Sequence, residues 1–159
     1  MKDLDWSNLS FGYRQTDYNV RCYYRNGKWG EIEVCSDEYL KLHMAATCLH
    51  YGQEAFEGLK AYRCPDGKVR VFRMDENAAR LQSTCRGIMM PEVPTEMFEE
   101  MVKKVVRLNQ EWIPTYESGA TLYIRPLLIG TSAQVGVHPA TEYCFLIFVT
   151  PVGPYFKGG

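Results

Sequence analysis

The dipeptide Asn26-Gly27 is the local signal that most restricts how this chain can fold. It separates the runs VRCYYR and KWGEIEV, which are rich in the β-branched and aromatic residues that favour strands. Asn-Gly supplies the two positive φ angles that a two-residue turn between antiparallel strands requires. The pattern therefore predicts a β-hairpin that begins at Asn19, and with it an antiparallel sheet.

The rest of the chain adds strands and two helices. A Pro-Asp-Gly turn predicts a second hairpin over Leu59–Arg73. Apolar residues at helical spacing predict helices after Asp75 and after Thr95, whereas Ala120–Ile129 and Tyr143–Thr150 have the composition of strands. This order predicts an α+β fold, with a mainly antiparallel sheet of about six strands and two main helices packed on one side.

The length of 159 residues suits one domain with a substantial core. We expect residues 1–150 to form that domain, and residues 151–159 to be a linker because prolines spaced in this way suit neither a helix nor a central strand. No apolar amino-terminal run and no stretch of about 18 apolar residues is present, so we expect a cytoplasmic protein with no membrane partner.

Charge and cysteine spacing argue against two classes of ligand. The net charge is −1 and no basic stripe is present, which argues against a nucleic-acid partner. The six cysteines include no CxxC pair, and Cys48 with His50 is the only close pair of soft ligands. We therefore expect neither a metal site nor a disulfide framework.

The stretch LHYGQEAFEGLKAYR, residues 49–63, changes character midway. We expect a short helical turn over Gln53–Phe56, a strand over Leu59–Tyr62 and a rigid corner at Glu57-Gly58. Such a corner would point Tyr51 and Phe56 toward whatever lies beside the sheet. Burial statistics favour core positions for these two aromatics, and the lining of a site is the alternative.

Two arginines are candidates for binding anions. Arg80 flanks the apolar stripe of its helix, where its guanidinium could hold a phosphate or carboxylate or simply form a surface ion pair. Arg125 and Tyr123 share one face of a predicted strand. An arginine on an apolar strand needs an acceptor, which is either a substrate carboxylate or an internal Asp or Glu.

Several other chemistries find no support. The sequence contains no GxGxxG, Walker or GxSxG motif, and none of its three histidines has a Ser or Cys partner at a recognisable spacing. Glu54 and Glu57 could form an acid and base pair, but capping of the local turn is the simpler interpretation. Hydrolase chemistry is therefore not expected.

Four motifs in order, LHYGQEAFEGLKAYR, VRVFRMDENAARL, TLYIRPLLIGT and VTPVGPYF, resemble the branched-chain amino acid aminotransferases, which have the class IV pyridoxal-phosphate-dependent fold. The resemblance runs from about Leu9 to Phe156 and corresponds to the amino-terminal, smaller domain of such an enzyme. It implies a homodimeric parent protein that uses pyridoxal 5'-phosphate to transfer the amino group of leucine, isoleucine or valine to 2-oxoglutarate.

The resemblance also implies roles for individual residues. Arg80 matches an arginine that holds the cofactor phosphate, and Arg125 matches one near the substrate carboxylate. Val135 and Val137 match an apolar loop that reaches into the neighbouring subunit's site, as the Tyr51 region does. The residues that match the lining of the substrate pocket are Phe11, Tyr51, Phe56, Tyr123 and Tyr155.

The resemblance leaves the catalytic lysine unassigned. In the family, the lysine that forms the Schiff base with the cofactor lies in the second domain, and no lysine of this sequence stands in a matching motif. Because transamination requires that amine, the resemblance implies that these residues include no catalytic residue. It also implies that the fragment alone is inactive and does not retain the cofactor.

Alternatives remain within and outside this family. A D-amino acid aminotransferase or an aminodeoxychorismate lyase would share the fold, although the YIRP and GPYF motifs disfavour both. A freestanding α+β domain that binds a small anion or a partner chain without catalysis is an alternative of a different class.

Overall fold

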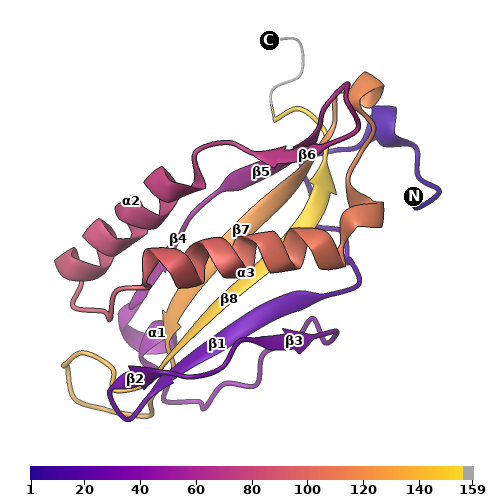
Figure 1. The fold of residues 1–159 in the computed structure, drawn as a ribbon. Helices are drawn as coiled ribbons and strands as arrows, with labels where there is room; N and C mark the ends of the chain where they lie inside the picture. Colours follow the sequence, from indigo (N-terminus) through magenta and orange to yellow (C-terminus); the bar gives the residue numbers. More distant parts are fainter. Residues whose placement is uncertain (156–159) are drawn as a thin grey trace.

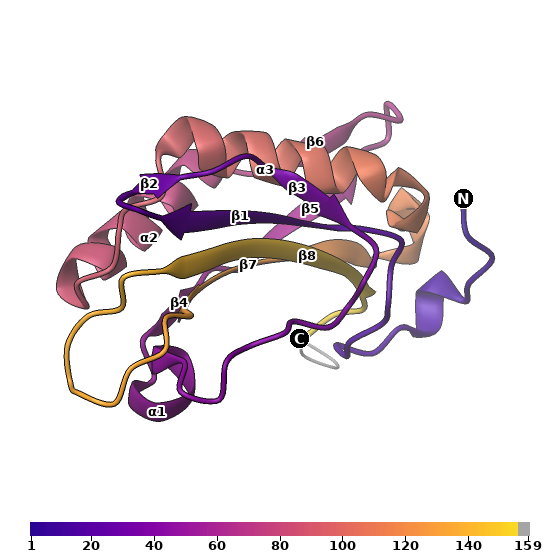
Figure 2. The same ribbon diagram turned by 90° about the horizontal axis from the view of Figure 1, so that it is seen from below.

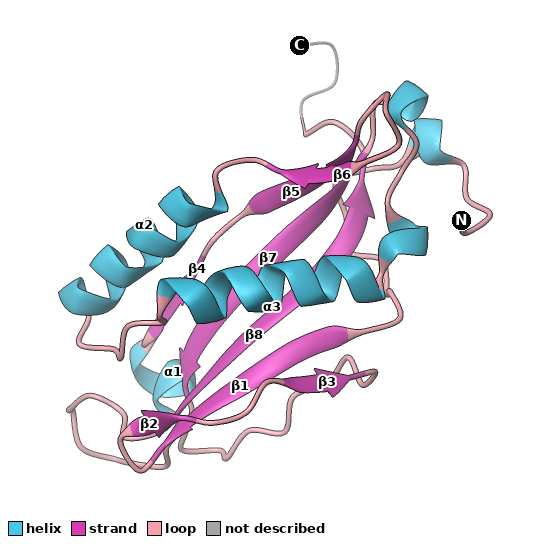
Figure 3. Cartoon of the chain, viewed as in Figure 1, coloured by secondary structure: helices cyan, strands magenta, loops and turns pink. Residues whose placement is uncertain are grey.

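The computed structural model describes residues 1–155, which form one antiparallel sheet with two long helices on one face (Figure 1; Figure 3). The helices are α1 (Thr47–Tyr51), α2 (Met74–Gly87) and α3 (Thr95–Leu108). The strands are β1 (Asn19–Arg25), β2 (Lys28–Trp29), β3 (Glu33–Cys35), β4 (Glu54–Phe56), β5 (Leu59–Arg63), β6 (Val69–Val71), β7 (Thr121–Gly130) and β8 (Tyr143–Val152).

The sheet has the strand order β2-β1-β8-β7-β5-β6, with β3 paired to β1 and β4 paired to β7. Six strands thus follow the main path and two short ones extend it, and all the pairs are antiparallel. The predicted α+β fold is confirmed.

Both predicted hairpins are present. Asn26 and Gly27 have φ angles of 53° and 76° between β1 and β2, as a two-residue hairpin turn requires. Gly67, with a φ angle of 77°, lies in the turn between β5 and β6. Turn chemistry therefore sets the pairing at both edges of the sheet.

The main core lies between the sheet and the helices α2 and α3 (Figure 2). Helix α3 contributes Phe98, Met101 and Val105, and helix α2 contributes Leu81 and Cys85. They pack against alternate residues of the strands, because successive side chains of a strand point to opposite faces. The strand residues in this core include Val20, Leu122, Ile124, Phe145 and Ile147.

The opposite face of the sheet carries the other residues of β7 and β8. A smaller cluster of Ile129, Cys144 and Leu146 lies there, and Leu40 and Leu42 from the connection between β3 and α1 pack against it. The amino-terminal segment is also fixed beside β8, because Gly153 N–H donates to the Ser10 carbonyl and Arg14 N–H donates to Thr150 Oγ1. This second face is therefore partly covered by loops, while helices cover the first.

The expected helical turn over Gln53–Phe56 is wrong. Helix α1 lies earlier and ends at Gly52, whose left-handed conformation (φ 59°) stops it. Residues Glu54–Phe56 instead pair with Leu127–Ile129 as strand β4. Tertiary pairing with β7 therefore overrides the local helical pattern.

The expected start of the linker at residue 151 is also too early, since Pro151 and Val152 belong to β8. Pro151 is tolerated because β1 pairs with β8 no farther than Ile147, so that β8 is bordered only by β7 at this point. Residues 156–159 lie outside the described part of the chain. Within residues 1–155, no helix is long and apolar enough to cross a membrane.

Candidate functional site

The corner at Glu57-Gly58 arises from an interruption between β4 and β5. Both strands pair with β7 in one continuous register, with Phe56 opposite Leu127 and Leu59 opposite Ile124. Glu57 N–H donates to the Pro126 carbonyl at 3.0 Å, but Pro126 has no N–H to donate in return. The proline therefore interrupts the ladder at the position where the corner forms.

Arg80 of α2 reaches this corner through an ion pair with Glu57. Its Nε and Nη2 donate to the two carboxylate oxygens of Glu57 at 2.9 and 2.6 Å. Asn77, three positions earlier on the same helix, also donates to Glu57, at 2.9 Å. Hydrogen bonds from Arg80 to this carboxylate, followed by its charge, raise the pKa of the Arg80 guanidinium, so that the side chain is a permanent cation.

Arg125 lies on β7 beside the same corner, but its hydrogen-bond acceptor is a phenol and not a carboxylate. Its Nε and Nη2 donate to Tyr123 Oη at 3.1 and 2.9 Å, and its guanidinium carbon lies 4.4 Å from the centre of the Phe56 ring. Within residues 1–155, no carboxylate forms an ion pair with Arg125. The internal Asp or Glu considered as its partner is therefore not what the structure shows.

Three aromatic rings continue the wall beyond Arg125. The Phe11 ring makes edge contacts with Tyr123, at 5.3 Å between ring centres, and with Tyr155, at 4.9 Å. Phe11 is carried by the amino-terminal segment that is fixed beside β8. Phe11, Tyr123 and Arg125 border a hollow of about 200 Å³, whose other lining residues are Gly12, Tyr13, Phe148, Thr150 and Val152.

Gly58 makes the close packing of this corner possible. A Cβ atom at Gly58 would lie 2.7 Å from Tyr123 Oη, which is closer than a real Cβ contact. The glycine thus leaves room for the hydroxyl group that holds Arg125. Phe56, Glu57 and Gly58 are consecutive, and they contact Arg125, Arg80 and Tyr123 respectively.

Tyr51, Val135 and Val137 form a second group at the other end of β7 and β8. The Tyr51 hydroxyl group donates to the Val135 carbonyl, which ties α1 to the connection between the two strands. The valines are exposed to 88% and 85%. The structure thus brings Phe11, Phe56, Tyr123, Arg125 and Tyr155 together at the corner that Arg80 also reaches, whereas Tyr51, Val135 and Val137 do not line the hollow.

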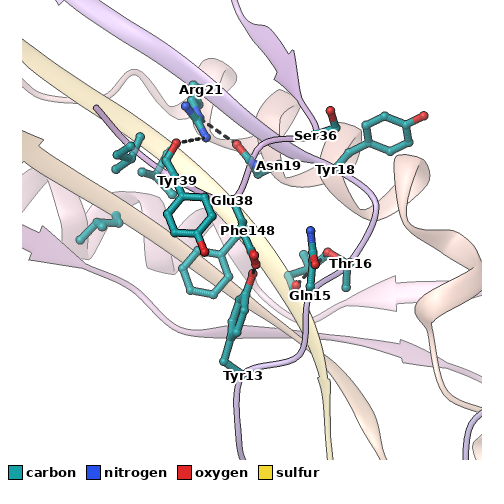
Figure 4. Close-up of a pocket in the computed structure, with 14 residues that line it drawn as sticks. Tyr13, Gln15, Thr16, Tyr18, Asn19, Arg21, Ser36, Glu38, Tyr39 and Phe148 are labelled. Carbon is teal, nitrogen blue, oxygen red and sulfur yellow. Dashed lines mark hydrogen bonds between the residues drawn. The ribbon is translucent and has the colours of Figure 1, made fainter. Parts of the chain in front are cut away.

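A larger pocket, of about 440 Å³, adjoins the hollow and shares Tyr13 and Phe148 with it (Figure 4). Tyr13 donates a 2.8 Å hydrogen bond to Glu38, and dashed lines in Figure 4 mark this contact. Burial, followed by the hydrogen bond to Glu38, raises the pKa of Tyr13 to about 12. Arg21, at the upper rim, is held by the Asn19 side chain and by the carbonyls of Asp37 and Tyr39.

The corner at Gly58 was expected, but three contacts were not: those of Asn77 with Glu57 and of Tyr13 with Glu38, and the close approach of Gly58 to Tyr123. A signal existed for the corner at Gly58, because a proline directly after Arg125 in a predicted strand marks a break in pairing. Asn77 had none, since its partner Glu57 is 20 residues away. Tyr13 had no such signal, since its partner Glu38 is 25 residues away. Within residues 1–155, no group of three or more His, Cys, Asp or Glu side chains is arranged to hold a metal ion.

Known proteins resemble this chain along its whole length. It is 52% identical over 159 residues to a branched-chain-amino-acid aminotransferase of Haemophilus influenzae and 48% identical over 159 residues to one of Helicobacter pylori. Both matches cover 100% of this chain but only 46% and 47% of the relatives, so the chain spans about half the length of the curated proteins it matches. No protein-family model matches the sequence.

Solved structures agree with these relatives. The branched-chain amino acid aminotransferase of Escherichia coli superposes with a TM-score of 0.70 at 27% identity, over 90% of this chain and 42% of that one. Another enzyme of the same name, solved with pyridoxamine 5'-phosphate, superposes with a TM-score of 0.62 at 27% identity, over 86% and 41% of the two chains. Along its whole length by sequence, and over about nine tenths of its length by fold, the chain is similar to branched-chain amino acid aminotransferases, of which it matches less than half.

Proposed function

We propose that the whole protein transfers the amino group of leucine, isoleucine or valine to 2-oxoglutarate, and that residues 1–155 supply one wall of its active site. The observation that carries this proposal is Arg125, a cation that has no carboxylate partner within residues 1–155 and that borders an aromatic hollow. The amino donors of such a reaction carry both a carboxylate and an apolar side chain. Arg125 would bind the carboxylate, and Phe11, Phe56, Tyr123 and Tyr155 would contact the side chain and exclude water.

The environment of Arg80 fits a phosphate monoester. Glu57 engages one edge of the guanidinium, and three of its five N–H donors remain for another acceptor. The side chain is 69% exposed, so a phosphate group can approach it. Arg80 would thus hold the phosphate of pyridoxal 5'-phosphate, which supplies the electron sink for amino transfer when bound.

The residues in hand would hold substrate and cofactor but lack the amine that amino transfer requires. The residues that line the hollow at Arg125 include no lysine. We place the required lysine in the part of the relatives that this chain does not span, with the linker that follows β8 leading toward it. The 159-residue chain alone should then be inactive and should not retain the cofactor.

Tyr51, Val135 and Val137 support a homodimer as the working assembly. Two valines exposed almost completely on one connection are unfavourable in water, and burying them against a second copy would remove that cost. In such a dimer this group would reach the partner's site. Its separation from the hollow of its own chain agrees with that role.

The experiment compares the full-length protein with the 159-residue chain. Full-length protein should transfer amino groups from leucine, isoleucine and valine to 2-oxoglutarate, and borohydride should fix the cofactor to one lysine outside these residues. D-alanine and aminodeoxychorismate test the related enzymes. The proposal would be rejected if the full-length protein acted only on D-alanine or only on aminodeoxychorismate, or if it acted on none of the amino donors tested.

Lys60 provides the internal control, because it lies opposite Tyr123 in the register of β5 and β7. A stoichiometric borohydride adduct on the 159-residue chain that Lys60→Ala abolishes would show that the lysine lies within these residues after all. We expect no such adduct.

A further inference from the structure

Glu57 has no role in the reaction proposed above, yet it is the one buried side chain that carries a charge within residues 1–155. It is 3% exposed. A buried carboxylate is costly unless it is paired and hydrogen-bonded. Its position in the corner therefore requires the partners that α2 provides.

The Glu57 carboxylate is fixed from two directions. Its own backbone N–H is bonded to Pro126 of β7, so the sheet sets where its side chain begins. Arg80 and Asn77, three positions apart on one face of α2, supply three hydrogen bonds of 2.6 to 2.9 Å to its two oxygens. The carboxylate is thus a rigid link between the sheet and α2.

The Arg80 side chain is rigid on one edge and open on the other. The Nε and Nη2 atoms form a fork onto Glu57, and the planar guanidinium cannot rotate without breaking both bonds. Its remaining N–H groups point away from Glu57 on a side chain that is largely exposed. The direction of the open edge is therefore set by Glu57 and not by Arg80 itself.

We propose that Glu57, with Asn77 as its second contact, is the positioning residue that aims the open edge of Arg80 at the cofactor phosphate. This inference rests on the phosphate-binding role proposed for Arg80. Two effects of Glu57 oppose each other. Its negative charge weakens the attraction of Arg80 for an anion, whereas its fork holds the guanidinium in the geometry for a bidentate phosphate contact.

Because the two effects of Glu57 oppose each other, the direction in which its removal changes the affinity for phosphate shows which effect is larger. In Glu57→Gln the amide accepts at one atom only and presents N–H groups to the guanidinium at the other, so the fork is lost together with the charge. Affinities of the full-length apoprotein are measured by absorbance titration with pyridoxal 5'-phosphate and with pyridoxal, which lacks the phosphate. We expect the first affinity to fall by about 10-fold, the value of one charge-assisted hydrogen bond, and the second to be unchanged.

Two outcomes of this titration overturn the inference. Unchanged or tighter binding of pyridoxal 5'-phosphate would show that the charge of Glu57 outweighs its positioning effect. An equal loss of affinity for both compounds would assign Glu57 to the stability of the fold alone. Asn77→Ala keeps the ion pair, and it should lower the preference for pyridoxal 5'-phosphate over pyridoxal by a smaller factor than Glu57→Gln does. This variant provides the test if Glu57→Gln does not fold.

Arg80→Lys separates this inference from the proposed function. Lysine keeps the charge but has no fork, so the preference for the phosphorylated compound should fall, and adding Glu57→Gln should change it no further. A full further loss in the double variant would show that Glu57 does not act through Arg80, while the role of Arg80 would stand. If Arg80→Met keeps the whole preference, the proposed role of Arg80 fails, and the inference fails with it.

Discussion

Arg80 and Arg125 lie on opposite sides of one corner and differ in how their charges are balanced. Arg80 pairs with a buried carboxylate, so the two charges cancel before any ligand arrives. Arg125 is held by a phenol and a ring face, which orient it, and no carboxylate of the described residues 1–155 compensates its charge. A guanidinium can thus be fixed with or without neutralisation of its charge, and removal of the arginine has a different consequence in each case.

Arg80→Met should give the largest loss of stability. It leaves the Glu57 carboxylate buried without its counter-charge, which costs about 3 kcal/mol in free energy of unfolding. Urea denaturation of the 159-residue chain measures this loss. Adding Glu57→Gln removes the buried charge, so the double variant should be more stable than Arg80→Met alone, and a less stable double variant would contradict the pairing.

Arg125→Met should affect activity and leave stability almost intact. Losing a charged bidentate contact to a carboxylate should lower kcat/KM of the full-length protein by about 100-fold. No buried charge is left behind, so the free energy of unfolding should change by less than about 1 kcal/mol. Arg70→Met is the matched control, since Arg70 pairs with Asp66 on the surface and should leave kcat/KM unchanged. Equal effects of the two arginine substitutions at the corner would remove the distinction drawn above.

Gly58→Ala tests the packing that the two arginines share. The new methyl group would lie 2.7 Å from Tyr123 Oη, and the overpacking should cost about 2 kcal/mol in free energy of unfolding. Tyr123→Phe removes the clashing oxygen, so Gly58→Ala should cost much less in that background. Gly87→Ala, where nothing lies within 4 Å of the new atom, is the control. If Gly58→Ala were as stable as Gly87→Ala, the close contact between Gly58 and Tyr123 Oη would be contradicted.

The smallest expected effect concerns Tyr13 at the edge of the hollow. Its pKa is raised to about 12, so its contribution to stability is complete below pH 10 and is lost as the pH rises from 10 to 12. Because the side chain is largely exposed, this contribution should be below about 1 kcal/mol. The measurement is the free energy of unfolding as a function of pH for the unsubstituted protein and for Tyr13→Phe. Parallel curves of the two proteins between pH 10 and 12 would reject the contact with Glu38.

The sequence predicted the parts of the fold that local chemistry determines. Asn26-Gly27 and the Pro-Asp-Gly turn fix their hairpins through backbone angles that those residues favour. It could not predict β4, because residues 54–56 become a strand only through pairing with β7, more than 70 residues away. The pairing of the end of β8 with β7 is also nonlocal, so the composition of residues 151–152 does not show that they belong to a strand.

The candidate site was predicted as a set of residues rather than as an arrangement. Tyr123 and Arg125 could be placed on one face, because alternation along a strand is a local property. The neutralisation of Arg80 by Glu57 depends on how α2 packs against the corner, and no spacing in the sequence shows that packing. The separation of Tyr51 from Phe56 likewise depends on Gly52, which ends α1 between them.

Pro126 has a consequence for protein design. A strand partner can leave the ladder most easily where its neighbour has no donor to offer, so the position of this one imino acid sets where along β7 the corner opens. Moving the proline two residues, to position 124, would move the weak point opposite Leu59, on the other side of Arg125. The location of a binding wall on an antiparallel sheet can thus be chosen by the position of one proline, which lacks a backbone N–H donor.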